Sequence, residues 1–386
     1  MKKRKILYIQ YTNPGGYPPL GHSSELLATA SWKVLFWGTH SFGENDLIRF
    51  KTLSNRRVYL LPYCGRGWLQ KLHYFLYTVM ALIIVAIWRP EWVYASDYFS
   101  CPVALIAKIT FRIKVLYHEH DSPDSTKNDS IYIKGLLKAR RRLSHAADIC
   151  ILPNVKRLES FLRETGTKAL TFCVWNCPQK NEVPTKPAKV DARIRLYFHG
   201  TITPKSFPLI FLKALARVIT PDVLLIIIGN ESIHSRGYIQ KIRRESQRLE
   251  ISHSVEIFLA MQRKELLKKC AECDIGLAAM GSRADTEINW KNMLGASNKI
   301  FDYMACGLAL LVPDAPDWRD VFVSPGYGIS YDPENLESIE KAFRLFLSNP
   351  NEVFEMGKRA REKIITDWNY ENQFAPVLNV LLKEKA

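Results

Sequence analysis

The sequence predicts an α/β protein made of two doubly wound parallel-sheet (Rossmann-like) domains. Thirteen short apolar runs rich in Val, Ile and Leu alternate with helical stretches along the 386 residues. Continuous apolar runs of this length are typical of strands that are buried on both faces, and therefore of parallel sheets. A chain of this length is also too long for one compact core and suits two domains.

The expected strands form two series. The first comprises residues 5–11, 32–38, 58–63, 91–96, 115–120, 148–153 and 170–175, and the second comprises 195–200, 223–229, 255–259, 274–280, 308–313 and 328–333. Helices such as Phe207–Val218, Tyr238–Leu249 and Lys264–Cys273 lie between strands and complete βα repeats. Two successive βα series predict two doubly wound domains, followed by helices over 335–347, 351–366 and 370–385.

The boundary between the domains is expected at a polar segment. Residues 176–193 contain three prolines and show no periodicity, which is typical of a linker. We therefore expect one domain over residues 1–180, a second over 193–367, and a final helix over 368–386.

The net charge of +16 is concentrated in the first half of the chain. Residues 1–190 contain 28 Lys and Arg against 13 Asp and Glu, whereas residues 191–386 contain 26 against 25. A basic half attracts anions such as membrane phospholipid, an acidic substrate or nucleic acid, although solubility alone is an alternative explanation. Nucleic acid is disfavoured, because the aromatic and basic motifs of known nucleic-acid modules are missing from the sequence.

An apolar stretch over residues 72–88 contains no Asp, Glu, Lys or Arg. It is short for a membrane span, and the strands on either side of it should join one sheet, which argues against crossing a bilayer. Two interpretations remain: a buried crossover helix, or a helix that lies in the membrane surface between basic and aromatic anchors. The basic N-terminal half slightly favours the membrane surface.

The cysteines and the N-terminus favour the cytoplasm. The eight cysteines suggest no disulfide framework, and the pair Cys270 and Cys273 lacks the second pair that a zinc site needs. The N-terminal run is broken by Gln10 and reads as a first strand rather than a signal peptide.

Candidate ligand-binding residues in the first half follow the expected strands, because open parallel sheets bind ligands beyond the carboxyl ends of their strands. Gly15 and Gly16 allow close backbone approach, and residues 23–24 are expected to cap the next helix; a plain tight turn is equally consistent. Alternation places His118 and His120 on one side of their strand, where they suit a general base or a sugar contact better than a metal. A surface loop that happens to hold two histidines is the alternative.

In the second half, the first strand ends at Gly200, which leaves room for a phosphate. Lys205 follows in the same loop, where its ammonium can reach that phosphate or simply be solvated.

A later helix offers the most informative pattern. Ser297 or Asn298 is expected to cap the helix that Lys299 opens, so that its free N–H groups face an anion. Asp302 lies four residues after Asn298 on nearly the same face, and its carboxylate suits the vicinal hydroxyls of a ribose.

The segment NKIFDYMACGLALLVPD (298–314) resembles the donor-binding segment of the retaining GT-B glycosyltransferases of family GT4, where the motif K-[LI]-x-E-Y-M-A-x-G-x-P-V recurs. The segments RPEWVYASD, VLYHEHD, AADICILPN, VWNCP, LYFHGTITPK and VEIFLAMQRKELLKKCAECDIGL agree with it, so the resemblance spans about residues 5–370. It implies the GT-B architecture. In that architecture residues 1–180 bind the acceptor, residues 193–367 bind the nucleotide sugar, and the final helix crosses back to the N-terminal domain.

The resemblance also implies roles in donor binding. Asp302 stands where the family has a Glu that bonds the donor ribose, and Lys205 matches the base that neutralises the diphosphate. Thr201 replaces the usual Arg, so Lys299 is a candidate substitute for the missing charge. Leu294 replaces the family's other Glu, which moves sugar recognition toward backbone groups around residues 295–298.

On the acceptor side, the resemblance implies that His120 contacts the donor sugar and that the loop of Gly15 and Gly16 lies beside the acceptor, together with His118. The expected catalytic residues are His120, Asp302 and Lys205. No metal and no cofactor are expected, since the nucleotide diphosphate sugar is a co-substrate.

The expected activity is retaining transfer of a sugar to a glycan or lipid-linked acceptor, in cell-envelope or exopolysaccharide synthesis, by a cytoplasmic enzyme peripheral to the inner membrane face. One alternative is a degenerate, non-catalytic partner subunit at the membrane, which the replaced Arg and Glu favour. A nucleotide-sugar epimerase or a sugar phosphorylase is another, although their acid–base carboxylates and cofactor-lysine motif are not apparent.

Overall fold

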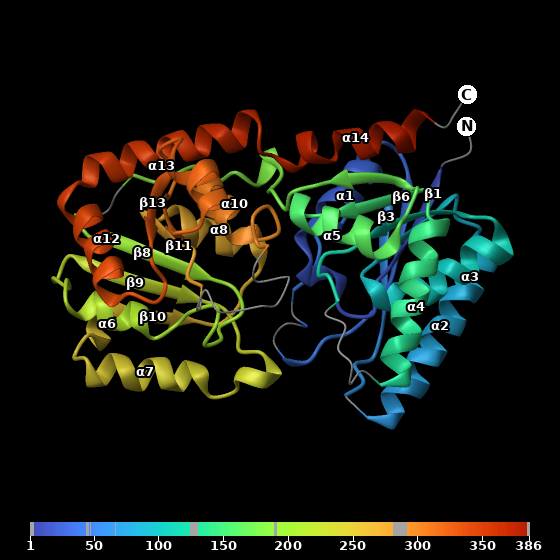
Figure 1. The fold of residues 1–386 in the computed structure, drawn as a ribbon, viewed down its shortest axis with the longest axis horizontal. Helices are drawn as coiled ribbons and strands as arrows, with labels where there is room; N and C mark the ends of the chain where they lie inside the picture. Colours follow the sequence, from blue (N-terminus) through green and yellow to red (C-terminus); the bar gives the residue numbers. More distant parts are fainter. Residues whose placement is uncertain are drawn as a thin grey trace. The chain divides into compact units, whose positions relative to one another are not determined.

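The computed structural model describes residues 4–43, 46, 48–65, 67–123, 130–188, 191–280 and 292–383 (Figure 1). The described residues form two compact units. Unit 1 gathers those of Met1–Asn176, Glu287–Ala296 and Tyr370–Ala386, and unit 2 gathers those of Cys177–Thr286 and Ser297–Asn369. Each unit is built on one sheet, and all strand pairs among the described residues are parallel.

Unit 1 has a seven-stranded sheet in the order β3-β2-β1-β4-β5-β6-β7. The order reverses beside β1, which is the switch point of a doubly wound sheet. Its strands are β1 Lys5–Ile9, β2 Lys33–Thr39, β3 Arg56–Leu61, β4 Trp92–Ser96, β5 Lys114–His118, β6 Ile149–Leu152 and β7 Leu170–Cys173.

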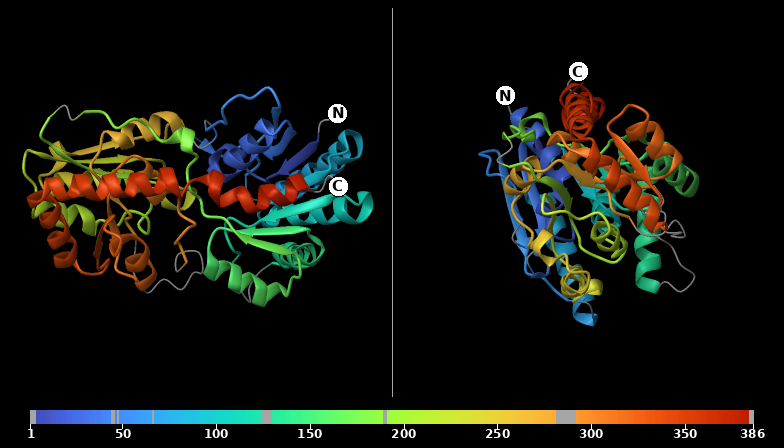
Figure 2. Two further views of the ribbon diagram at one scale, coloured as in Figure 1. Left: turned by 90° about the horizontal axis from the view of Figure 1, so that it is seen from above. Right: turned by 90° about the vertical axis from the view of Figure 1, so that its left-hand side faces the viewer.

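Helices cover both faces of this sheet. One apolar core lies between the sheet and the helices α2, α3, α4 and α5, and a second lies between the sheet and the pair α1 and α14 (Figure 2). The helices of unit 1 are α1 Pro18–Thr29, α2 Trp68–Trp88, α3 Cys101–Phe111, α4 Ile131–Ala146, α5 Val155–Thr165 and α14 Tyr370–Lys383, with a 3-10 turn η1 over Pro14–Gly16.

Unit 2 has a six-stranded sheet in the order β10-β9-β8-β11-β12-β13. Its strands are β8 Ile194–His199, β9 Val223–Ile228, β10 Val255–Phe258, β11 Ile275–Leu277, β12 Ala309–Pro313 and β13 Gly328–Tyr331. The main core packs this sheet against α6, α7 and α12, and the helices α8, α10 and α13 pack together with β12. The helices of unit 2 are α6 Ile210–Ala216, α7 Tyr238–Arg248, α8 Arg263–Ala271, α10 Asn298–Ala305, α11 Pro316–Trp318, α12 Leu336–Ser348 and α13 Pro350–Thr366.

The expected strands are all present, so the fold class read from the sequence is confirmed. The helix expected over 370–385 is α14, apart from residues 384–386, which lie outside the described part of the chain. The prediction that residues 23–24 cap a helix is wrong. The helix α1 begins at Pro18, whose fixed φ suits the first turn, and Ser23 and Ser24 are buried inside it.

The apolar stretch over residues 72–88 forms part of α2, which is long and apolar enough to cross a membrane by length and composition alone. The strands on either side of it, β3 and β4, lie in the same sheet, so α2 connects two strands of one unit. Only 22% of its most apolar window is buried. The crossover part of the first interpretation is therefore confirmed, but α2 is buried on one side only.

Candidate nucleotide-sugar and acceptor sites

Lys299 and Gly200 meet at the carboxyl end of β8 in unit 2. Gly200 has a φ of +127°, and a Cβ placed on it would lie 2.5 Å from Cε and 3.2 Å from Nζ of Lys299. The Lys299 ammonium also lies 4.8 Å from the centre of the Phe198 ring. The missing side chain at Gly200 therefore lets a lysine from α10 lie against the strand end.

Burial lowers the pKa of Lys299 to about 8. The ammonium is still mostly protonated at neutral pH, and an anion beside it would favour the charged form further. Lys299 thus supplies a desolvated positive charge at the end of β8, where the sequence has Thr201 rather than an arginine.

The start of α10 confirms one part of the expected cap and corrects another. Ser297 is the N-cap residue, with extended backbone angles, but its side chain makes no capping hydrogen bond. The Oδ1 atom of Asn298 is buried and has no hydrogen-bond partner among the described residues. The first turn of α10 thus lacks a side-chain cap, so its N–H groups and helix dipole remain available to an anion.

Asp302 lies inside an ion-pair network of unit 2 and is 1% exposed. Its two carboxylate oxygens accept bonds from the guanidinium of Arg263 at 2.9 and 3.1 Å, and Nε2 of His199 lies 3.4 Å away. Arg263 also donates to Glu182 at 2.5 and 3.0 Å, so it bridges two carboxylates. A carboxylate has about four lone-pair positions, which leaves Asp302 able to accept a further bond.

The charges of this network follow from burial and pairing. Burial raises the pKa of Asp302, but Arg263 and His199 outweigh it, and the net direction is down. Burial lowers the pKa of His199, and the neighbouring Lys299 and Arg263 add to this effect. His199 is therefore neutral, and we assign the Nε2 proton to the bond with Asp302. This assignment leaves Nδ1 as a buried acceptor without a hydrogen-bond partner in the described structure.

Lys205 is exposed in the loop that follows Gly200. Two hydrogen bonds order this loop. The N–H of Thr203 donates to Oγ of Ser206 at 2.9 Å, and the N–H of Ser206 donates to Oγ1 of Thr203 at 3.0 Å. The side chain of Ser206 also donates to the carbonyl of Thr201. The loop therefore holds the backbone from Gly200 to Lys205 in a defined turn.

In unit 1, His118 and His120 lie together, which confirms the expected alternation. Their ring centres are 3.9 Å apart, and Nδ1 of His118 lies 2.5 Å from the hydroxyl of Tyr94. The intervening Glu119 points the other way, where Arg140 binds both of its oxygens at 2.5 and 2.8 Å. Burial lowers the pKa of His118, and burial together with Arg157 lowers the pKa of His120 to about 3.

The backbone of His120 is held from both sides. Its N–H donates to Oδ1 of Asp97 at 2.8 Å, and its carbonyl accepts from Nη1 of Arg157 at 2.8 Å. Asp97 follows β4 with a φ of +59°, and burial and then Asp121 raise its pKa to about 7. The Nε2 atoms of His118 and His120 are buried with no hydrogen-bond partner among the described residues. A neutral imidazole edge at this position can bind a hydroxyl group.

The glycine loop lies beside His120. A Cβ on Gly15 would lie 2.5 Å from the carbonyl oxygen of Ile48, whereas one on Gly16 would meet no atom within 4 Å. Gly15 is thus required by close packing, and Gly16 borders open space. The next residue, Tyr17, has its ring centre 5.3 Å from that of His120. The structure therefore places the residue that follows Gly16 beside His120.

Leu294 occupies the position where a second Glu was expected. Its carbonyl accepts a bond from the Asn154 side chain within unit 1. The neighbouring Gly295, with a φ of +77°, packs against Trp175 and accepts the N–H of Asn176 at 2.8 Å. The described residues include no group of three or more His, Cys, Asp or Glu that could hold a metal ion.

Sequence reasoning missed Arg263, Glu182, His199, Asp97 and Arg157. Asp97, His199 and Arg263 lie within segments that carry the resemblance, but each of the five residues gains its role from a partner on another element. His199 could have been noticed, because it is the last residue of the strand β8 and lies directly before Gly200.

Comparisons with known proteins agree with this geometry. Residues 179–363 match the family model "Glycosyl transferases group 1". No curated protein sequence matches the chain significantly.

Solved structures share the fold over nearly the whole chain. Anabaena HepE in complex with UDP and glucose has a TM-score of 0.70 at 17% identity, covering 98% of this chain and 99% of that one. Sucrose-phosphate synthase from Thermosynechococcus elongatus has a TM-score of 0.71 at 15% identity and 98% coverage of both chains. WaaG, a glycosyltransferase involved in lipopolysaccharide biosynthesis, has a TM-score of 0.66 at 10% identity, covering 98% of this chain and 100% of that one. The chain therefore has the GT-B fold, and its residues 179–363 match the glycosyl transferases group 1 family.

Proposed function

We propose that this protein is a retaining glycosyltransferase that binds a nucleoside diphosphate sugar in unit 2. The observation that carries the proposal is the placement of the Lys299 ammonium against the open backbone of Gly200, beside the uncapped start of α10. A partly buried cation and free N–H groups at one point form a receptor for a diphosphate. UDP is the first nucleotide to test, because HepE is similar in fold and its structure contains UDP.

In this proposal the diphosphate is bound by Lys299, Lys205 and the N–H groups that follow Ser297 and Asn298. The leaving diphosphate gains negative charge during transfer, and fixed cations and dipoles stabilise that charge. Lys299 supplies the positive charge of the arginine that the family usually has at the position of Thr201. Because two lysines supply the positive charge, we propose a metal-independent reaction. Activity that persists in excess EDTA would agree, and activity restored only by added Mg²⁺ would not.

The nucleoside ribose is assigned to Asp302 and His199. The carboxylate of Asp302 accepts a bond from one hydroxyl, and the free Nδ1 of His199 accepts from another. Arg263 keeps this carboxylate ionised and oriented. This compensates for the shorter side chain of Asp302, which stands where the family has a glutamate.

Acceptor binding is assigned to unit 1. Gly16 borders open space, and the buried imidazoles of His118 and His120 offer their Nε2 atoms to hydroxyl groups. Their low pKa values keep both rings neutral, so they act as hydrogen-bond partners rather than cations. His120 is proposed to contact the transferred sugar.

The acceptor is proposed to be a glycan or a lipid-linked glycan used in cell-envelope or exopolysaccharide synthesis, at the cytoplasmic face of a membrane. The exposed apolar side of α2 supports a membrane location, as does the excess of basic residues in the first half of the chain. Exposed apolar patches of this kind mark surfaces that bind a membrane or another protein.

A non-catalytic partner subunit is the second candidate, because Thr201 and Leu294 replace two functional residues of related enzymes. Incubation with UDP-, GDP- and ADP-sugars separates the two. Slow release of free sugar and nucleoside diphosphate from one donor is the expected result, with faster release of the nucleoside diphosphate when a suitable acceptor takes the sugar. An absence of turnover together with an absence of nucleotide binding would favour the partner subunit.

A further inference from the structure

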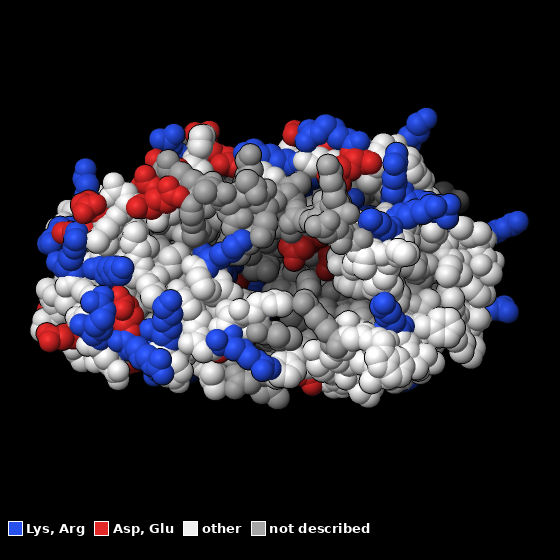
Figure 3. All heavy atoms as spheres, turned by 60° about the horizontal axis from the view of Figure 1, so that its bottom comes forward, with Lys and Arg blue, Asp and Glu red and all other residues white. Residues whose placement is uncertain are grey.

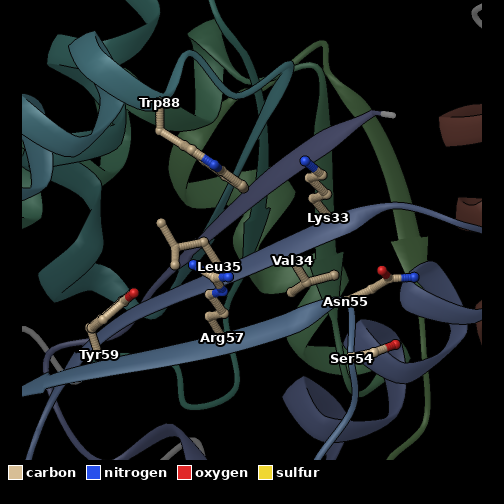
Figure 4. Close-up of a pocket in the computed structure, with 8 residues that line it drawn as sticks. All are labelled: Lys33, Val34, Leu35, Ser54, Asn55, Arg57, Tyr59 and Trp88. Carbon is tan, nitrogen blue, oxygen red and sulfur yellow. The ribbon is translucent and has the colours of Figure 1, made fainter. Parts of the chain in front are cut away.

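A cavity of unit 1 lies away from the carboxyl ends of its strands. It has a volume of about 270 Å³ and opens beside the edge strand β3, near the amino-terminal ends of β2 and β3 and the last residue of α2 (Figure 4). Its lining residues are Lys33, Val34, Leu35, Ser54, Asn55, Arg57, Tyr59 and Trp88. The proposed acceptor residues follow the opposite ends of the strands, so this cavity is separate from them.

The cavity combines two cations with apolar and aromatic walls. Lys33 and Leu35 share one face of β2, and parallel pairing sets Arg57 beside Leu35 on β3. Lys33 and Arg57 are exposed, and neither forms an ion pair with any residue that the structure describes. Trp88 closes the side toward α2 and is held by Lys5, whose Nζ donates to the Trp88 carbonyl at 2.7 Å. Two unpaired cations over such walls suit an anionic group that carries an apolar tail.

The helix beside this cavity carries an apolar face toward solvent. Tyr74, Tyr77, Ala81 and Val85 point into the core, and the opposite side of α2 is exposed. The exposed apolar residues of α2 are Trp68, Leu69, Leu72, Phe75, Leu76, Val79, Met80, Ile83 and Ile87. Exposed residues of the adjoining α3 extend this face: Ile106, Ile109 and Phe111.

This α2 face carries little charge of its own. Within Trp68–Trp88 the sequence has no acidic residue, and Lys71 is its only Lys or Arg. The right-hand part of the surface in Figure 3, where α2 lies, is mostly white with single blue side chains among it. Each Lys or Arg that lies near an anionic bilayer surface strengthens binding to it, so cations at the border of this apolar face would favour such a surface.

We propose that the cavity is a binding site for the phosphate of an anionic phospholipid, and that it orients α2 in the membrane surface. Lys33 and Arg57 bind the lipid phosphate, while Trp88 and Tyr59 sit at the level of the headgroups. The exposed side of α2 enters the acyl boundary. This inference rests on the membrane location given under the proposed function, and it assigns that location to particular residues.

A soluble anion explains the cavity less well. A phosphate ester in solution needs the two cations but not the apolar helix face that borders them. A bilayer satisfies both features at once, because it presents phosphates directly above apolar chains.

Co-sedimentation with lipid vesicles tests the proposal on the full chain. Vesicles of phosphatidylcholine alone are compared with vesicles that also contain phosphatidylglycerol. The variant Lys33→Gln/Arg57→Gln removes the two cations of the cavity. The matched control is Lys134→Gln/Lys138→Gln, which removes two exposed charges of α4 in the same unit but outside the cavity.

The wild type is expected to bind the phosphatidylglycerol vesicles, and the cavity variant to bind them about tenfold less tightly or weaker still. The control is expected to stay within about twofold of the wild type. Equal losses in both variants would overturn the proposal, because diffuse attraction would then explain binding. Binding to phosphatidylcholine that equals binding to phosphatidylglycerol would overturn it as well.

Calorimetry with UDP on the same variants keeps the two proposals distinguishable. The cavity variant is expected to bind UDP like the wild type, since the donor residues lie in unit 2. A failure of every variant to bind UDP would count against the proposed glycosyltransferase while leaving the vesicle result intact.

Discussion

The side chain of Lys299 lies where any residue other than glycine at position 200 would place its Cβ. The separation from that position is 2.5 Å to Cε and 3.2 Å to Nζ. Gly200 directly follows the strand β8, and Lys299 is the second residue of the helix α10, so the contact joins the two elements that should bind a diphosphate. Only a glycine at position 200 leaves room for the side chain of Lys299, and Lys299 supplies the positive charge for the diphosphate.

Replacing Gly200 with alanine should disturb both residues. The new Cβ would collide with Lys299, and a φ of +127° is costly for alanine. We expect Gly200→Ala to lower the free energy of unfolding by about 1–3 kcal/mol in urea denaturation and to weaken UDP binding. In a Lys299→Ala background the collision disappears, so the loss of stability should be smaller. Equal losses in both backgrounds would contradict the contact.

Arg263→Ala should destabilise unit 2, because it leaves Asp302 buried without its strongest partner. We expect a loss of about 3–5 kcal/mol in the free energy of unfolding, measured in urea. The control Arg248→Ala breaks a pair with Glu245 on the surface, which water screens, and should cost far less. Similar small losses for both variants would mean that the Asp302 pair contributes little.

Asp97 should make stability depend on pH in an unusual direction. Its folded pKa is about 7, against about 3.9 in the unfolded chain, so the folded state holds the proton more tightly. Its contribution to the free energy of unfolding is therefore full below about pH 4 and is lost as the pH rises toward 7.

The variant Asp97→Asn isolates this effect. It keeps an oxygen for the His120 N–H but does not titrate. The difference in free energy of unfolding between wild type and variant should change between about pH 4 and pH 7, by up to about 1.4 kcal/mol per pH unit. Parallel stability curves for the two proteins over this range would show that Asp97 has an ordinary pKa.

The α2 face should contribute to membrane binding that salt does not abolish. Phe75→Gln/Ile83→Gln removes two exposed apolar side chains, and we expect vesicle binding to fall about tenfold or more in high salt as well as low salt. The control Leu345→Gln/Phe354→Gln alters two exposed apolar residues of unit 2 and should bind like the wild type. Unchanged binding of the α2 variant would argue against the α2 face as a membrane surface.

Much of the fold was predictable because it depends on local patterns. Short apolar runs gave the strands of both sheets, and the position of Ser297 as N-cap followed from its residue type and the helix after it. The start of α1 was misplaced, because Ser23 and Ser24 resemble caps in sequence but lie inside a helix begun by Pro18.

The sites were predictable only where one segment contains the chemistry. Lys299 and His120 lie within short distinctive stretches and could be selected from the sequence. Arg263 could not, because its role depends on Asp302, which lies 39 positions later. Asp97 was missed for the same reason, because its partner is the backbone N–H of His120, which follows the next strand along the chain.

Titration calorimetry with nucleoside diphosphates tests the central claim most directly. The wild type should bind one of UDP, GDP and ADP, and Lys299→Ala should weaken that binding about tenfold or more, since a charge-assisted bond contributes about 1.5–3 kcal/mol. Lys264→Ala, which removes an exposed lysine of α8, should bind like the wild type. Equal affinity of Lys299→Ala and the wild type, or no binding of any of the three nucleotides, would contradict the account.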